Sequence, residues 1–167
     1  LPTRATPAPV AGGHTDWTSV SAGANHTCGR RAGGRAFCWG SDFWSQLGTS
    51  AATAFEPTPV EVDDGAVTGW GSPEAGGRHS CATRAGRLLC WGTDIVGQLG
   101  DGAPASTQVL PVEVDGSVTT WRRVVAGGDH TCALRTSGSL WCWGNNDIGQ
   151  VGDGFSGGVY PSPHRVG

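Results

Sequence analysis

The chain has 167 residues, 37% of them hydrophobic, and a formal net charge of −3. This length fits a single domain, the negative charge argues against a nucleic-acid-binding surface, and no apolar run approaches the ~20 residues of a membrane-spanning helix. The 29 glycines follow no collagen-like period, so they indicate many tight turns between short strands. Methionine is absent. Without an initiator methionine, we expect a processed form or part of a longer polypeptide.

One sequence pattern recurs three times along the chain. The first copy begins at Trp17, and the copies share Trp39, Trp91 and Trp143, which are separated by 52 residues at each step. Residues 26–39 of the first copy predict two strands around a glycine turn. A loop ending in Gln-Leu-Gly follows. In the first two copies a Pro-Val-Glu-Val segment comes next, and its alternation is typical of a half-buried strand.

A period of about 50 residues with roughly four short strands is typical of a β-propeller blade. No segment shows a sustained helical period, so the predicted fold class is all-β, with antiparallel blades. One blade cannot bury both of its faces, so neighbouring blades must stack. We expect the end of a preceding repeat or a linker strand at 1–16, repeats at 17–69 and 70–120, and a third repeat with a closing strand at 121–167.

The repeat Ala-Gly-x-x-His-Thr-Cys, turn, Cys-Trp-Gly-x-Asn-x-x-Gly-Gln-Leu-Gly resembles the regulator of chromosome condensation repeat. The resemblance covers nearly the whole chain and is best in the third copy, at residues 143–152. The first copy departs from it at Ser45, where the others carry Gly97 and Gly149. The resemblance implies a propeller of about seven blades. It also implies protein binding through loops at one face, as in the family's exchange-factor and β-lactamase-inhibitor members.

Six cysteines form three predicted hairpin pairs, one in each copy: Cys28 with Cys38, Cys81 with Cys90, and Cys132 with Cys142. In the second pair, a two-residue turn at 85–86 places the cysteines opposite each other at a non-hydrogen-bonded position, where Cα atoms lie about 4.5–5.5 Å apart. The other pairs enclose one more residue, which a three-residue loop with a glycine bulge absorbs. Three disulfides imply an oxidising compartment, so we expect a secreted or cell-surface protein.

One histidine recurs beside each cysteine pair, at His26, His79 and His130. Each histidine and its two sulfurs offer three metal ligands, which leaves metal binding or free thiols as the alternative to disulfides. Zinc sites usually show Cys-x-x-Cys spacing and four ligands, so we predict no metal and no cofactor. We interpret the recurring histidine as a structural hydrogen-bonding group between strands, rather than as three active sites. His14 and His164 lie outside the repeat, without a partner visible in the sequence.

Three further residues are candidates for an interaction site. Asn25 opens an Asn-His-Thr sequon for N-glycosylation. The same slot holds Arg78 and Asp129 in the other copies, so we expect it to be exposed. Phe43 and Trp44 form an aromatic pair in a loop-like segment, and large aromatic side chains often dominate the energetics of an interface. Local packing is the alternative role for this pair.

No residue pattern in the chain supports catalysis. Acidic side chains recur with the strand pattern and are interpreted as a solvated face: Glu61, Asp63, Asp64, Glu113 and Asp115. The Gly-Asp-Gly segments at 100–102 and 152–154 supply one carboxylate each, too few for calcium, and turn chemistry explains them. We therefore predict that the chain is not an enzyme. The alternative, a hydrolytic or metal-dependent enzyme, would require an activity that His130→Ala removes.

These features predict an extracytoplasmic propeller module for protein–protein interaction or assembly. Three blades cannot close a ring of about seven. The chain is therefore expected to be a fragment of a longer propeller, or to complete a ring or filament with other chains or further copies of itself, because bare strand edges recruit partners. The alternative is a structural subunit of an extracellular filament or appendage, built from these repeats.

The cysteine pairing predicts a specific change in mass. Reduction of three disulfides adds two hydrogens to each, so the intact mass of the denatured chain should rise by six hydrogens. Mass spectrometry before and after reduction measures this difference. An unchanged mass, or bound zinc, would contradict the disulfide assignment.

Overall fold

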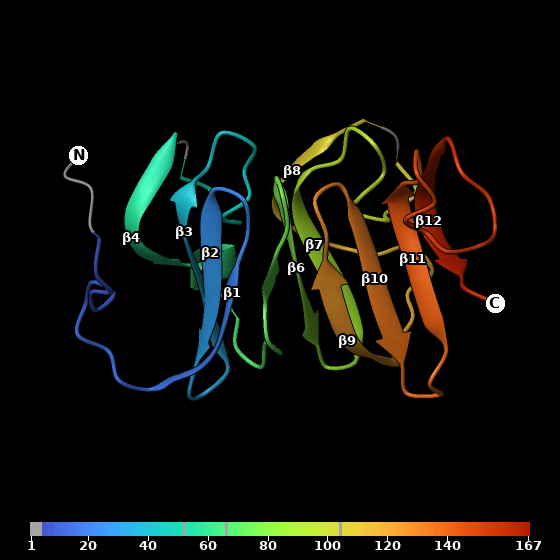
Figure 1. Ribbon diagram of the computed structural model, residues 1–167. Helices are drawn as coiled ribbons and strands as arrows, with labels where there is room; N and C mark the ends of the chain where they lie inside the picture. The colour runs from blue at the N-terminus through green and yellow to red at the C-terminus, as the bar shows by residue number, and fades with distance from the viewer. Residues whose placement is uncertain (1–4, 52, 66, 104) are drawn as a thin grey trace.

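The computed structural model describes residues 5–51, 53–65, 67–103 and 105–167. These residues form three antiparallel sheets of four strands each, with strands in chain order, and no α-helix (Figure 1). The first sheet contains β1 (Trp17–Ala22), β2 (His26–Arg31), β3 (Arg35–Ser41) and β4 (Phe55–Glu61). A short 3₁₀ turn, η1 (Val62–Gly65), follows it. The second contains β5 (Glu74–Ala75), β6 (His79–Arg84), β7 (Arg87–Thr93) and β8 (Thr107–Glu113). The third contains β9 (Trp121–Ala126), β10 (His130–Arg135), β11 (Leu140–Asn145) and β12 (Val159–Arg165).

The three sheets stand in a row as the blades of a partial propeller, with the first and third at opposite ends (Figure 1). The predicted all-β propeller-blade class is confirmed. The innermost strands β1, β5 and β9 contact one another in sequence. Strand β5 is short, and the residues before it pair less regularly with β6, through the Gly71 N–H, which donates to the Thr83 carbonyl at 2.7 Å. The outermost strands β4, β8 and β12 all contain proline.

The central hairpin of each blade sets the position of its disulfide. In the second blade, Ala85 and Gly86 both have positive φ, of 50° and 77°, as a two-residue type I′ turn requires. Arg84 then pairs with Arg87, and Cys81 pairs with Cys90. The turn length therefore fixes the cysteine register, as the sequence predicts.

All six cysteines are in disulfides: Cys28–Cys38, Cys81–Cys90 and Cys132–Cys142. In each pair the Cα atoms are 4.1 Å apart, slightly closer than expected. The third hairpin uses the predicted three-residue loop, in which Arg135 pairs with Ser139 and Gly138 has a φ of 86°. The disulfides are confirmed.

The core lies between blades rather than within them. Trp91 of the second blade is fully buried in a cluster with Leu47 and Val62 of the first. Trp143 of the third blade packs in the same way with Leu99 and Val114 of the second. The 52-residue repeat therefore corresponds to a repeated packing unit. In it, the second and third blades each pack a tryptophan against the preceding blade.

The glycine of each Gln-Leu-Gly segment makes room for that tryptophan. A Cβ atom on Gly48 would lie 2.6 Å from Nε1 of Trp91, and one on Gly100 would lie 2.4 Å from Nε1 of Trp143. Both distances are shorter than any non-bonded carbon contact. The repeated pairing of Cys-Trp-Gly in one copy with Gln-Leu-Gly in the preceding copy is thus a steric requirement.

Ser45 has a backbone conformation that favours glycine. Its φ is 57°, and the equivalent Gly97 and Gly149 have φ values of 73° and 85°. A left-handed conformation costs a residue with a Cβ about 1–2 kcal/mol, part of which the flexibility of glycine in the unfolded chain offsets.

We expect Ser45→Gly to raise the free energy of unfolding by about 0.5–1 kcal/mol, measured by urea denaturation. Ser41→Gly is the matched control, because Ser41 lies in β3 outside the left-handed region. There the added chain entropy should lower stability. If both variants shift stability in the same direction, backbone strain at Ser45 is not the cause.

Candidate functional site

The loop after β3 holds the aromatic pair that the sequence singled out. Asp42 Oδ1 accepts a hydrogen bond from the Leu47 N–H at 2.9 Å, and Gln46 Oε1 accepts one from the Trp44 N–H at 2.9 Å. Asp42 and Gln46 are both buried. The loop is therefore fixed from beneath by two side chains, while Phe43 at its tip is 74% exposed.

Phe43 and Trp44 border a surface hollow of about 730 Å³, named here the aromatic hollow. Its lining residues are Asn25, Ser41, Phe43, Trp44, Gln46, Phe55 and Arg78. Arg78 comes from the second blade, and its guanidinium carbon lies 5.2 Å from the centroid of the Trp44 ring. The aromatic hollow thus spans two blades and combines exposed aromatic surface with one cation.

Asn25 lies at the rim of the same hollow and is exposed, as are Arg78 and Asp129 in the equivalent slots. The structure therefore brings the sequon residue and the aromatic pair together, although they are distant in the sequence. Whether Asn25 carries a glycan and whether Phe43 and Trp44 bind a partner both stay predictions.

The recurring histidines link one blade to the next. Nε2 of His26 lies 2.8 Å from Oγ of Ser80, and Nε2 of His79 lies 2.9 Å from Oγ1 of Thr131. Each hydroxyl also donates to a backbone carbonyl of the preceding blade, Ser80 to Gln46 at 2.8 Å and Thr131 to Gln98 at 2.8 Å. Because the hydroxyl proton is used there, the histidine must donate through an Nε2–H.

Burial keeps these histidines neutral. It lowers the pKa of His26 to about 4 and that of His79 to about 3. Their Nδ1 atoms are buried and have no hydrogen-bond partner in the described part of the chain. A neutral ring with a fixed tautomer and one satisfied nitrogen suits a structural link between blades.

The same glutamine carbonyls accept a second hydrogen bond from the next blade. Nε1–H of Trp91 donates to the Gln46 carbonyl at 2.9 Å, and Nε1–H of Trp143 donates to the Gln98 carbonyl at 3.1 Å. We name this set of contacts the blade junction. It joins the histidine and the glutamine carbonyl of one blade to the hydroxyl and the tryptophan of the next. Its members are His26, Gln46, Ser80 and Trp91 at the first junction, and His79, Gln98, Thr131 and Trp143 at the second.

The metal alternative does not fit this geometry. The sulfurs that would ligate a metal are bonded to each other, and the His26 and His79 rings face hydroxyl groups. Residues 5–51, 53–65, 67–103 and 105–167 contain no group of three or more His, Cys, Asp or Glu side chains placed to hold a metal ion. The repeated glutamates instead form ion pairs at the surface, as Glu113 does with Arg87 at 2.9 Å.

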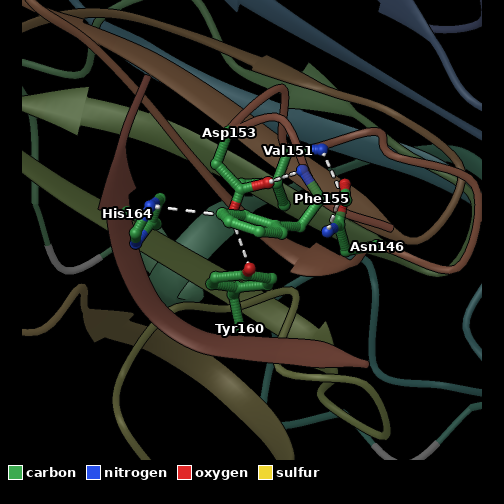
Figure 2. Close-up of polar contacts among 6 residues, drawn as sticks. All are labelled: Asn146, Val151, Asp153, Phe155, Tyr160 and His164. Carbon is green, nitrogen blue, oxygen red and sulfur yellow. Dashed lines mark hydrogen bonds and ion pairs between the residues drawn. The ribbon is translucent and has the colours of Figure 1, made fainter. Parts of the chain in front are cut away.

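A polar cluster joins the loop at Asp153 to strand β12 (Figure 2). The Tyr160 hydroxyl donates to Asp153, and His164 Nε2 lies 3.7 Å from Asp153 Oδ2. This partner of His164 cannot be inferred from the sequence pattern, because the contact crosses from a loop to the following strand.

This cluster does not have the electrostatics of a catalytic acid–base pair. The hydrogen bond from Tyr160 holds the pKa of Asp153 below its usual range, and the same bond raises the pKa of Tyr160. Proton transfer near neutral pH needs groups whose pKa values are shifted towards 7. In the second blade Asp101 contacts Gln108 at the equivalent positions, 3.4 Å apart. The shared contact fastens the loop to the outermost strand.

Asp94 in the second blade is, like Asp42 in the first, a buried carboxylate that the sequence did not single out. Asp94 is fully buried, and its Oδ1 accepts from the Leu99 N–H at 2.7 Å, while its Oδ2 has no partner among the described residues. Burial raises the pKa of Asp94 to about 7. In the third blade Asn146 takes this position (Figure 2). Its Oδ1 accepts from the Val151 N–H at 2.9 Å, and its Nδ2 donates to the Phe155 carbonyl at 3.2 Å.

Within the described residues, no helix has the length and apolar character that crossing a membrane requires.

Comparison with known proteins identifies the framework that carries these features. A family model described as the regulator of chromosome condensation (RCC1) repeat matches residues 17–43 and 115–150. RUG3, a mitochondrial RCC1 domain-containing protein of Arabidopsis thaliana, is 32% identical over 140 residues. The chain belongs to the RCC1 repeat family. HERC6 of Homo sapiens, a probable E3 ubiquitin-protein ligase, shares 31% identity with these RCC1 repeats over 137 residues.

Solved structures show the same arrangement of blades. Yeast RCC1 (Prp20), crystallised with Kap60, has a TM-score of 0.78 at 22% identity, over 93% of this chain and 38% of that chain. Human WBSCR16 has a TM-score of 0.78 at 19% identity, over 90% of this chain and 38% of its own. The matches cover 80% of this chain but 30% of RUG3, and 79% of this chain but 13% of HERC6. This chain thus spans only a minor part of the length of these relatives.

The difference between Asp94 and Asn146 predicts a pH-dependent change in stability. The folded pKa of Asp94 lies above the ordinary value of 3.8 for an aspartate. Its stabilising contribution is therefore full below pH 3.8 and is lost as the pH rises through about 7. We expect Asp94→Asn to raise the free energy of unfolding by about 2 kcal/mol at pH 8, with a smaller gain at pH 5.

Urea denaturation at both pH values measures this effect. Asn146→Asp is the reverse change and should lower stability more at pH 8 than at pH 5. An Asp94→Asn gain that is equal at the two pH values would show that Asp94 does not titrate in this range.

Proposed function

We propose that this chain is an extracytoplasmic protein-interaction module that binds a partner at the aromatic hollow. The observation that carries the proposal is the fixed loop that exposes Phe43 beside Trp44 and Arg78. A large exposed aromatic group held on a rigid loop binds with little loss of conformational entropy. RCC1 propellers offer precedent, since the structure of Prp20p from Saccharomyces cerevisiae is described together with its binding to Gsp1p and histones.

The chemistry of the hollow selects the kind of partner. Phe43, Trp44 and Phe55 supply apolar contact area, and Arg78 supplies a positive charge at its border. A protein segment with an aromatic or aliphatic anchor next to an acidic side chain matches both properties. This pairing would draw Arg78 into a hydrogen-bonded ion pair with the partner while the anchor covers the aromatic rings.

The cellular setting is also part of the proposal. Three disulfides in a chain of this size favour an oxidising compartment, and hence secretion or display at the cell surface. In a host with N-glycosylation, a glycan on Asn25 would stand at the rim of the aromatic hollow. Glycosylation and partner binding would then exclude each other.

A second candidate function is a structural subunit of a filament or other homo-oligomer. It is favoured by the apolar faces at the two ends of the blade row, where Val20 and Leu140 are exposed. Exposed strand edges support it less, because the outermost strands contain prolines, which interrupt edge pairing.

The binding proposal is tested with peptides selected on the immobilised chain from a random display library. Selected peptides should combine an aromatic or aliphatic residue with an acid. Trp44→Ala should weaken their binding at least ~30-fold, the effect of losing about 2 kcal/mol at an interface hot spot. Isothermal titration calorimetry measures the dissociation constants.

Phe155→Ala is the control, since Phe155 is an exposed aromatic residue in a loop of the third blade and does not line the aromatic hollow. Its binding should equal that of the parent chain. Peptides that bind Trp44→Ala and the parent chain equally well would contradict the proposed site.

A further inference from the structure

The loop between β7 and β8 gathers oxygen-bearing side chains around Asp94. The Asp94 N–H donates to the Ser106 carbonyl at 2.7 Å, which closes the loop. Gln108 of β8 pairs with Gly92 of β7, so its side chain also stands at this end of the blade. Nε2 of Gln108 lies 3.1 Å from Oγ of Ser106 and 3.4 Å from Oδ2 of Asp101. The loop therefore brings two carboxylates, an amide and a hydroxyl together.

Folding places a second carboxylate beside the one that the Gly-Asp-Gly segment supplies. The Asp94 carboxyl is buried and within hydrogen-bonding reach of Asp101; burial first, and then the Asp101 charge, raise its pKa. The sequence alone predicts no metal here, because Asp94 lies directly after β7 and is separate from the Gly-Asp-Gly segment. Two carboxylates in contact repel each other unless a proton or a cation stands between them.

Asp94 is fully buried, and one of its two oxygens has no partner. Its Oδ1 accepts from the Leu99 N–H, whereas its Oδ2 accepts no hydrogen bond among the described residues. In the third blade, Asn146 fills the same position with an amide whose Nδ2 donates to the Phe155 carbonyl (Figure 2). The loop can thus be built without a carboxylate. A buried carboxylate oxygen without a partner is costly, so Oδ2 calls for a positive ligand when Asp94 is ionised.

We propose that the second blade binds a calcium ion between Asp94 and Asp101. Oδ2 of Asp94 and a carboxylate oxygen of Asp101 are the charged ligands. Oγ of Ser106 supplies a third oxygen. Gln108 supplies a fourth through Oε1, because a half-turn of its amide exchanges the oxygen with the nitrogen. Water completes the coordination shell, since calcium takes about 6–8 oxygens. This site is independent of partner binding at the aromatic hollow.

The ligand set selects calcium among the common divalent cations. All four side chains offer oxygen, which hard cations prefer, whereas zinc sites in proteins are built mainly from sulfur and nitrogen ligands. The ligands come from a loop and a strand at irregular spacing. Calcium tolerates irregular coordination, and magnesium requires a near-ideal octahedron and gives up its water reluctantly. Asp101 is only half-buried, so an ion can reach the site from solvent.

The number of carboxylates sets the expected affinity. Two carboxylates are fewer than high-affinity calcium sites contain, so we expect a dissociation constant of about 0.1–1 mM, in the range of extracellular modules. Calcium at the concentrations outside cells would then occupy much of the site, in agreement with the extracytoplasmic setting proposed above.

The other two blades show which substitutions this loop accepts. Asn146 stands at the position of Asp94 in the third blade, and Thr49 stands at the position of Asp101 in the first. Asp94→Asn and Asp101→Thr therefore each remove one carboxylate and leave a side chain that the same loop already carries elsewhere. Asp129→Asn is the matched control, because it removes an exposed carboxylate from a loop where the first blade carries asparagine.

Nuclear magnetic resonance of the ¹⁵N-labelled chain, titrated with calcium chloride, measures both affinity and place. The amide signals of Leu99 and Ala103 should shift most, because these N–H groups donate to Asp94 and Asp101. The parent chain and Asp129→Asn should saturate with the same dissociation constant. Asp94→Asn and Asp101→Thr should bind at least tenfold more weakly, and magnesium chloride should bind the parent at least tenfold more weakly than calcium.

Urea denaturation gives a second measurement that does not depend on assigned signals. Calcium should raise the unfolding midpoint of the parent chain above its value in EDTA, because the ion binds the folded state, and should leave that of Asp94→Asn unchanged. Since Asp94→Asn is expected to be the more stable chain in EDTA, loss of its calcium response cannot be attributed to unfolding.

A parent chain whose signals and unfolding midpoint do not respond to about 10 mM calcium would overturn the inference, because a proton alone would then settle the carboxylate pair. Equal calcium affinity in the parent chain and Asp94→Asn would also overturn it, since the ion would then bind elsewhere. Equal affinity for magnesium would exclude a calcium-selective site.

Discussion

The fold depends on one backbone carbonyl in each of the first two blades, that of Gln46 and that of Gln98. Each accepts two hydrogen bonds from the next blade, one from a hydroxyl and one from an indole N–H. A buried polar group is costly unless it is satisfied, and here three polar groups satisfy one another at the point where two blades meet. The glycine two residues further on then follows from geometry, because any side chain there would collide with the tryptophan.

The histidine completes this network, and its neutral state ties stability to pH. The folded pKa values of His26 and His79 lie below the ordinary histidine value of 6.5, so protonation favours the unfolded chain. Their stabilisation is full above pH 6.5 and is lost as the pH falls through about 4 and about 3. Asp94 acts in the opposite direction, because its burial favours the protonated carboxyl. The junctions and the loops beside them therefore oppose each other between pH 4 and pH 7.

The sequence predicts what depends on local spacing and misses what depends on the stacking of blades. Turn length alone gives the register of Cys81 with Cys90, because side chains alternate strictly along a hairpin. The partner of His26 is Ser80, in another blade, and periodicity does not reveal whether a repeated residue bonds within its own blade or to its neighbour. The pKa of Asp94 was hidden for the same reason, since an aspartate in a loop looks exposed until its burial is known.

The aromatic hollow depends on the stacking of two blades. The aromatic hollow takes its loop from the first blade and Arg78 from the second, so it exists only where two blades are stacked. Ile148 occupies the position of Trp44 in the third blade and is exposed, with no following blade beside it in the described chain. In the second blade Ile95 and Val96 take the positions of Phe43 and Trp44, and Asp129 takes that of Arg78. Within the described residues, the aromatic pair and the cation therefore meet only at the junction of the first two blades, so this hollow differs from its equivalent in charge and in aromatic content.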